Sequence, residues 1–181
     1  MNKLLYWISG FLPCRYINDG NVRYLERYYL FTLLGWRFYL HQFVGSDPDR
    51  WLHCHPWKMA FSIILSGWYW EETVYGTRKV RWFNWLTGES KHRVVLPCSL
   101  DGFRDLGCAE HHGVDPCWTL FFHRAENAKT WGFYQSIDGH PEALLFVPYQ
   151  YTREGNQRDW WLTAPTGKEL RSVRVRKAGD A

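Results

Sequence analysis

The sequence predicts an all-β protein with one domain, and three features of the chain support this. Aromatic residues make up 19% of the 181 residues, and aromatic side chains favour the half-buried surface of a β-sheet. Short aromatic and β-branched runs recur at intervals of roughly ten residues, separated by turn signals. The length and a hydrophobic fraction of 46% suffice for one buried core. Together these features predict a sandwich or a barrel.

The predicted strands follow one another along most of the chain. In order they cover residues 25–34, 36–44, 61–65, 68–75, 80–86, 94–96, 117–123, 131–135 and 144–151. Gly35 separates the first two as a hairpin or bend, and residues 76–79 are expected to form the turn between 68–75 and 80–86. Pro148 places the last strand at an edge or an end of a sheet.

The chain divides into three predicted segments. Residues 1–21 carry a short apolar run that we interpret as an element docking on the sheet, because it is too short to span a bilayer and lacks a signal-peptide cleavage site. Residues 22–152 contain the predicted barrel. Residues 153–181 are a polar extension, which Trp160 and Trp161 are expected to clamp onto the body.

The charge is modest and unevenly distributed. A net charge of +4 does not by itself imply nucleic-acid binding, although residues 168–177 contain five cations. The alternation of Val173 and Val175 with arginines is compatible with a basic edge strand, and a loose, solvated tail is the plain alternative. Binding of a nucleic acid is the functional alternative for this tail. We expect no nucleic-acid binding by the rest of the chain.

The cysteines indicate a reducing compartment. There are five, an odd number, scattered without a Cys-x-x-Cys pair, a pattern that does not suit a disulfide scaffold. We therefore expect a cytoplasmic protein.

The triplet His53-Cys54-His55 is the first candidate for chemistry. On an extended strand, residues two apart share a face. The two imidazoles would therefore project side by side, with Cys54 turned the other way toward the core. Two neutral imidazoles presented together are half of a transition-metal site.

The surroundings of this triplet resemble the first motif of the cupin superfamily. That motif opens with a Gly, carries His-x-His on a barrel strand, and closes at a second Gly. The matching residues here are Gly45, His53, His55 and Gly67. The resemblance covers roughly residues 36–136 and implies a small jelly-roll barrel with the histidine pair pointing into its mouth.

Two departures from the family pattern affect the predicted site. The Glu that usually follows the second His by four or five residues is replaced by Met59 or Ala60. Pro97-Cys98-Ser99 resembles the Pro-x-Gly turn of the second motif, but the His expected after it falls on Gly102. The best substitutes are His111 and His112. We favour His112, which lies nearer the strand leading to Trp118, and both alternatives stay open.

The resemblance implies a metal site and an enzyme. His53, His55 and His112 would offer three nitrogen ligands to one divalent transition metal and leave positions open for water or substrate. Imidazole suits Fe, Zn, Ni and Cu, and three-histidine sets among cupin oxygenases make Fe the first expectation. Tyr69 and Glu71 are the predicted catalytic residues, binding or protonating a substrate in the barrel mouth. His92, between Lys91 and Arg93, is interpreted as a surface residue.

These features give one leading function and two alternatives. The leading one is a metal-dependent cupin enzyme acting on a small molecule, with oxygenase-like chemistry ahead of isomerase or lyase chemistry. A metal-free epimerase-like or isomerase-like cupin is the second, with a His as base and Tyr69 as acid. The third is a non-catalytic barrel that binds a small ligand against its aromatic lining. The family resemblance also implies a homodimer formed through sheet edges.

Overall fold

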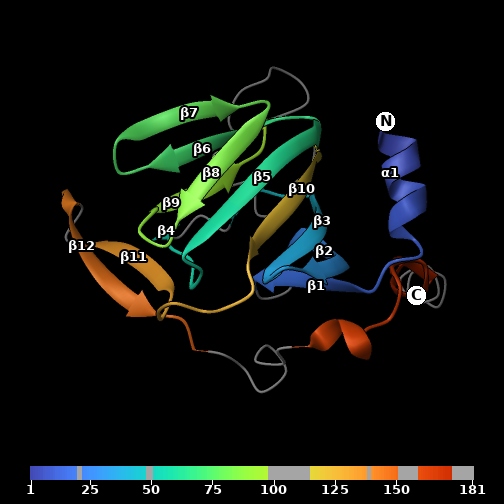
Figure 1. The fold of residues 1–181 in the computed structure, drawn as a ribbon. Helices are drawn as coiled ribbons and strands as arrows, with labels where there is room; N and C mark the ends of the chain where they lie inside the picture. Colours follow the sequence, from blue (N-terminus) through green and yellow to red (C-terminus); the bar gives the residue numbers. More distant parts are fainter. Residues whose placement is uncertain (20–21, 48–50, 98–114, 138–139, 151–158, 173–181) are drawn as a thin grey trace, which may run out of the picture.

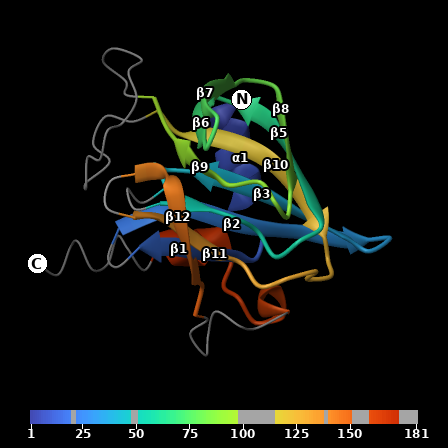
Figure 2. The same ribbon diagram turned by 90° about the vertical axis from the view of Figure 1, so that its left-hand side faces the viewer.

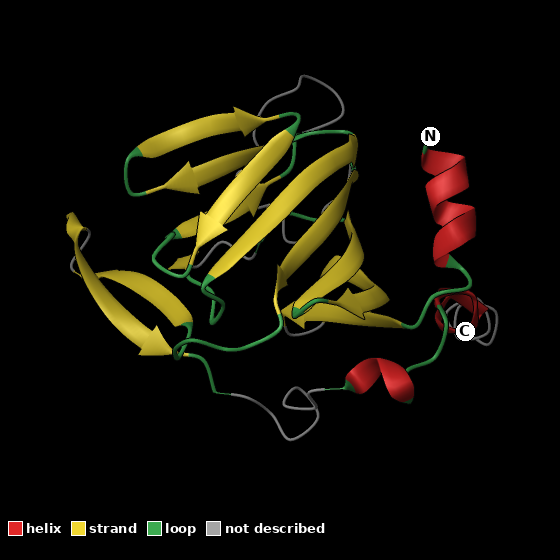
Figure 3. Ribbon diagram, viewed as in Figure 1, coloured by secondary structure: helices red, strands yellow, loops and turns green. Residues whose placement is uncertain are grey.

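The structure, a computed structural model, describes residues 1–19, 22–47, 51–97, 115–137, 140–150 and 159–172. Strands dominate this part of the chain, and its helical segments lie near the two chain ends (Figure 3). These segments are α1 (Asn2–Ser9), the 3-10 helix η1 (Trp160–Leu162) and the helical residues 167–172. No helix in the described part of the chain has the length and apolar character needed to cross a bilayer.

The strands form two six-stranded sheets whose neighbouring strands are antiparallel (Figure 1). The first sheet has the order β1-β2-β3-β10-β5-β8. Its strands are β1 (Cys14–Asp19), β2 (Val22–Leu33), β3 (Trp36–Phe43), β10 (Cys117–Arg124), β5 (Met59–Ser66) and β8 (Phe83–Thr87). The prediction of an all-β jelly-roll barrel is confirmed.

The second sheet has the order β12-β11-β4-β9-β6-β7. Its strands are β12 (His140–Pro148), β11 (Gly132–Ile137), β4 (Leu52–His53), β9 (His92–Val95), β6 (Tyr69–Thr73) and β7 (Gly76–Val80). Figure 2 shows the β11–β12 hairpin extending this sheet along the side of the barrel. The hairpin joins the sheet where Phe133 pairs with His53.

The two hairpins predicted from glycines had different outcomes. Leu34 and Gly35, at φ 50° and 73°, form the turn between β2 and β3, which confirms the first. The second prediction was wrong, because residues 76–79 belong to strand β7 and the turn lies at Val74 and Tyr75. Tyr75 is 96% exposed, and the Thr73 hydroxyl accepts a hydrogen bond from its backbone N–H. β7 is an exposed edge strand, so its polar composition resembles that of a loop.

The strand that follows this turn also pairs differently from the prediction. Residues 80–86 were expected to return along 68–75. Instead β7 pairs with β6, and β8 crosses to the first sheet, where Phe61 on β5 is opposite Trp85. The chain therefore crosses from the second sheet at β7 to the first sheet at β8 and returns to the second sheet at β9, which pairs with β4.

Two apolar regions hold the barrel together. Between the sheets, buried residues from both make a core that includes Tyr39, Phe121, Val94 and Leu96. On the outer face of the first sheet, Leu5 of α1 packs in a second cluster. The predicted N-terminal segment 1–21 therefore contains a docked helix and also β1, which pairs with β2.

The C-terminal extension closes the first sheet at its inner side. Trp160 is buried and stacks on Tyr39, and Trp161 stacks on Tyr29, so the predicted tryptophan clamp is confirmed. The prediction of an edge strand is wrong for residues 168–172, which are helical. Arg171 holds this helix to α1 by donating to the backbone oxygen of Tyr6. Residues 173–181 lie outside the described part of the chain.

Candidate metal centre

Three histidines meet at the inner face of the second sheet. His53 on β4 is directly paired with His92 on β9, and His55 follows two residues after His53. Their ring centroids are 4.8–5.1 Å apart. One nitrogen from each ring lies within 4.8 Å of the other two. Three imidazole nitrogens gathered this closely can bind a single metal ion.

The sequence predicted two of these three residues. His53 and His55 lie together as expected, and Cys54 between them is fully buried on the other side. The interpretation of His92 as a surface residue was wrong, because it is only 4% exposed. The predicted third ligands, His111 and His112, lie outside the described residues.

A signal for His92 is present in the sequence in hindsight. His92 and Val94 are two residues apart on β9, so they share its buried face, while Arg93 points away and pairs with Glu72. The charged neighbours Lys91 and Arg93 suggested a solvated segment. The two-residue spacing from His92 to the apolar Val94 predicts correctly that the His92 side chain is buried.

Glu71 determines which nitrogen of His92 is available. The Nδ1 of His92 lies 2.9 Å from Oε1 of Glu71. A carboxylate only accepts hydrogen bonds, so Nδ1 carries the proton and Nε2 of a neutral ring keeps its lone pair. That Nε2 lies 2.9 Å from Nε2 of His55. A carboxylate that orients a histidine in this way is a common feature of metal sites.

The other two histidines are in the protonation state that metal binding requires. Burial, followed by the nearby His92 ring, lowers the pKa of His53 well below its usual value. Burial and the neighbouring His53 and His92 do the same for His55. Both imidazoles are therefore neutral at pH 7 and hold a lone pair for a ligand. The donor set fits a first-row transition metal.

A buried polar network stands behind the three histidines. Glu71 is 2% exposed and lies on β6 next to β9. It accepts hydrogen bonds from Asn84, at 2.6 Å, and from Nε of Arg78, at 2.7 Å. Burial alone would raise the pKa of Glu71, but the bonds and charges of His92, Asn84 and Arg78 hold it below its usual value. The carboxylate is therefore ionised and fixed in place.

The two predicted catalytic residues both belong to this network. Glu71 is hydrogen-bonded to His92, one of the three histidines of the centre. Tyr69 is linked to it less directly: Asn84 donates to the Tyr69 hydroxyl at 3.2 Å and to Glu71. Burial is the main cause that raises the pKa of Tyr69, so its phenol stays protonated.

The first strand of the family motif contributes no carboxylate here. Ala60 occupies one of the positions where the motif has its Glu, and it is buried on β5 opposite Leu86. The buried carboxylates near the histidines come from elsewhere. Glu71 lies behind His92, and Asp47 accepts a bond from the backbone of Val94 and lies 3.8 Å from Nδ1 of His53.

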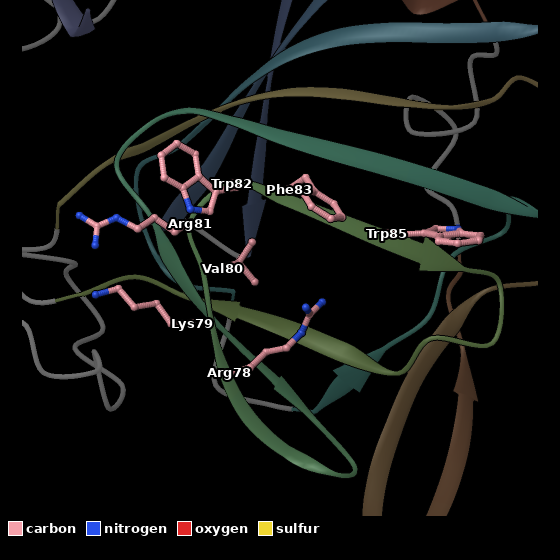
Figure 4. Close-up of a pocket in the computed structure, with 7 residues that line it drawn as sticks. All are labelled: Arg78, Lys79, Val80, Arg81, Trp82, Phe83 and Trp85. Atoms are coloured by element: carbon pink, nitrogen blue, oxygen red, sulfur yellow. The ribbon is translucent and has the colours of Figure 1, made fainter.

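A surface cleft of about 340 Å³ lies over β7 and β8, lined by residues 78–83 and Trp85 (Figure 4). Figure 4 shows Lys79 and Arg81 pointing to one side while Phe83 and Trp85 lie along β8. Arg78 belongs both to this cleft and to the network behind the histidines, since its guanidinium forms an ion pair with Glu71 at 2.6 Å.

Comparisons with known proteins identify similar folds. No family model matches the chain, and no curated protein matches it. A cupin-2 domain protein from Rhodospirillum rubrum is 14% identical, with 91% of this chain and 82% of that one covered and a TM-score of 0.46. A cupin-like protein from Thermotoga maritima is 10% identical, with 71% and 90% covered and a TM-score of 0.47.

Proposed function

We propose that this protein is a cupin-type enzyme that binds one divalent transition metal through His53, His55 and His92 and acts on a small molecule. The observation that carries the proposal is the convergence of three imidazole nitrogens within 4.8 Å at the inner face of the barrel. Oxygenase-like chemistry is the specific reaction class that we propose.

The ligand chemistry supports a catalytic rather than a closed structural site. Three nitrogen ligands leave coordination positions open, whereas structural zinc sites use four protein ligands. A metal held here would supply Lewis-acid activation and a binding position for substrate or dioxygen. Fe is our first expectation, and Zn, Ni and Cu are compatible with the same ligands.

The chain's own residues have separate roles in this proposal. Glu71 already makes bonds to His92, Asn84 and Arg78, so it acts as an orienting residue that fixes the tautomer of His92. Tyr69 keeps its proton and is the proposed proton donor on this wall. Its hydroxyl accepts a hydrogen bond from Asn84, and a protonated phenol also carries a hydrogen that it can donate.

Metal analysis of protein purified without chelators tests the proposal. We expect close to one transition-metal ion per chain. A His53→Ala/His55→Ala double variant should lose it, whereas His123→Gln, which changes a buried histidine outside the cluster, should retain it. Comparing His92→Ala with His112→Ala identifies the third ligand. Full metal content in the double variant would overturn the site assignment.

A metal-free acid–base enzyme, epimerase-like or isomerase-like, is the second candidate function. The buried His92–Glu71 pair, with Tyr69 beyond Asn84, supplies a base and an acid in one network. The short contact between His55 and His92 is also a good hydrogen bond when one of the two nitrogens carries a proton. A metal-free wild-type protein stabilised by a sugar nucleotide would favour this function or a non-catalytic binding barrel.

A further inference from the structure

The inner face of the first sheet carries a row of polar residues. Arg15 on β1 is paired with Arg27 on β2, Arg27 with His41 on β3, and His41 with Thr119 on β10. Direct cross-strand partners point to the same side of a sheet. His41 stacks on Phe121 of the inner core, so this row faces the barrel interior.

Arg27 is the cation at the centre of this row. Its Nε–H donates to Nε2 of His41 at 3.1 Å, and its guanidinium carbon lies 5.5 Å from the centre of the Tyr39 ring. Among the described residues no carboxylate forms an ion pair with it. Arg23 on the same strand, by contrast, has Glu26 at 2.8 Å. A half-buried guanidinium without a counter-ion is costly, and burial lowers the pKa of Arg27.

Thr119 provides an independent second observation. The residue is 0% exposed, and its hydroxyl has no hydrogen-bond partner among the described residues. Buried hydroxyls in folded proteins are nearly always bonded, so an unpaired one points to a missing partner. The neighbouring His41 accepts from Arg27 at Nε2, and its neutral tautomer therefore carries a proton at Nδ1. The row is rich in donors.

This row lies near the histidine centre. The Trp57 ring stacks on His55, with centroids 4.7 Å apart, and on His123, with centroids 4.0 Å apart. Trp57 also lies against Phe121, with centroids 5.5 Å apart, and the Phe121 ring stacks on His41 of the row at 4.7 Å. A continuous series of ring contacts therefore links the row to His55. The buried carboxylates Asp47 and Glu71 lie by the second sheet instead.

We propose that the row centred on Arg27 binds the anionic group of the substrate, a carboxylate or a phosphate ester. This inference rests on the proposed function, because the remainder of that substrate would reach the open positions beside His53, His55 and His92. A guanidinium matches the geometry of both anionic groups, and the Thr119 hydroxyl is a further donor. The substrate class is thus an organic anion, and the rings beside the row, such as Tyr39 and Phe121, favour one with an apolar body.

Calorimetric titration of the full chain with three probes tests this assignment. The probes are benzoate, phenyl phosphate and the uncharged benzyl alcohol. They are titrated into metal-stripped protein, because an anion can also coordinate a metal directly. We expect one or both anions to bind and benzyl alcohol not to bind measurably. The anion that binds more tightly shows whether the site prefers a carboxylate or a phosphate ester.

Variants locate the site. Arg27→Met should weaken anion binding by about tenfold to a hundredfold, the usual effect of losing hydrogen bonds to a charged group. Arg23→Met removes the same charge from the same strand, at a residue with its own carboxylate, and should leave binding unchanged. Thr119→Val, a change of similar shape, should give a smaller loss, and it serves as the test if Arg27→Met does not fold.

The outcomes separate this inference from the proposed function. Benzyl alcohol binding as tightly as the anions, or Arg27→Met and Arg23→Met behaving alike, would overturn the anion site even if metal analysis succeeds. Anion binding that depends on Arg27, in a protein that never takes up metal, would support the anion site and count against the metal enzyme.

Discussion

The two inner walls of the barrel are built on different principles. At the second sheet, polar groups satisfy one another: His92, Glu71 and Arg78 of that sheet form one bonded network with Asn84, which reaches them from β8 at the edge of the first sheet. On the first sheet, rings such as Tyr39 and Trp160 stack against each other, and Arg27 lies among them with no ion pair to a carboxylate of the described segments. One wall is held by hydrogen bonds and the other by packing.

This difference separates two tasks. A saturated network fixes the direction of a side chain, which is what a metal ligand needs. A guanidinium among rings that has no ion pair within the described part of the chain keeps its binding capacity for a ligand that arrives from outside. The same interior can thus place a metal at one wall and recognise an anion at the other.

Removing the centre of the bonded wall should have the largest effect. Glu71→Leu leaves the buried Nδ1–H of His92 without an acceptor and removes the stronger of the two acceptors of the Asn84 amide, and we expect the free energy of unfolding to fall by about 3 kcal/mol. Metal affinity should fall by about tenfold to a hundredfold. Urea denaturation and a metal-competition titration measure the two effects.

The adjacent carboxylate is the matched control for that variant. Glu72 lies on the opposite face of β6 and pairs with Arg93, and both side chains are partly exposed. Glu72→Gln should therefore have a smaller effect on stability and none on metal affinity. Equal metal affinity in Glu71→Leu and Glu72→Gln would contradict the orienting role of Glu71.

The packed wall is tested by removing one of its rings. Trp160→Ala takes a buried ring from the cluster with Tyr39 and detaches the extension, so we expect a loss of about 3 kcal/mol in urea denaturation. Leu162→Ala changes a side chain that is 76% exposed and should stay within about 0.5 kcal/mol of wild type.

The crossing between the walls depends on a glycine. Gly67 joins β5 of the first sheet to β6 of the second at φ 81°, and a Cβ there would lie 2.7 Å from the Pro116 carbonyl oxygen. Gly67→Ala should lower the free energy of unfolding by about 2 kcal/mol or more. Gly35 has a similar φ of 73°, but a Cβ there would meet only the end of the Arg124 side chain, at 3.6 Å. Gly35→Ala should therefore lower the free energy of unfolding by less, and its effect measures the backbone strain alone. Equal losses would show that the close approach is unimportant.

The smallest expected effect depends on pH. Burial lowers the pKa of His123 on the packed wall to about 3, against 6.5 in the unfolded chain. The unfolded state therefore binds more protons below pH 6.5, and stability is lost as the pH falls from there toward 3. At pH 5 protonation of His123 in the unfolded chain should lower the free energy of unfolding by about 2 kcal/mol relative to neutral pH. Urea denaturation of metal-stripped protein at pH 7.5 and at pH 5 measures this drop in the free energy of unfolding. In the His123→Gln variant the drop should be smaller by about 2 kcal/mol. A drop equal to that of the wild type would exclude His123 as its source.

Local patterns were enough for most of the strands and for two of the three histidines of the centre. Alternation placed His53 and His55 on one face, and glycine marked the β2–β3 turn. Alternation did not determine which strands are neighbours. The placement of His92 next to His53 depends on β8 crossing to the first sheet, and nothing in residues 76–87 alone requires that crossing.

The residue pattern is enough to predict an all-β chain with a histidine pair on one strand face, because side-chain period and turn residues act over a few positions. Which side chains meet depends on the folded barrel. Folding brings His92 and Glu71 to that pair and places Arg27 on the facing wall, where no carboxylate of the described residues pairs with it. The reason is physical: pairing between strands distant in sequence is set by the burial of the whole barrel, which no local pattern encodes.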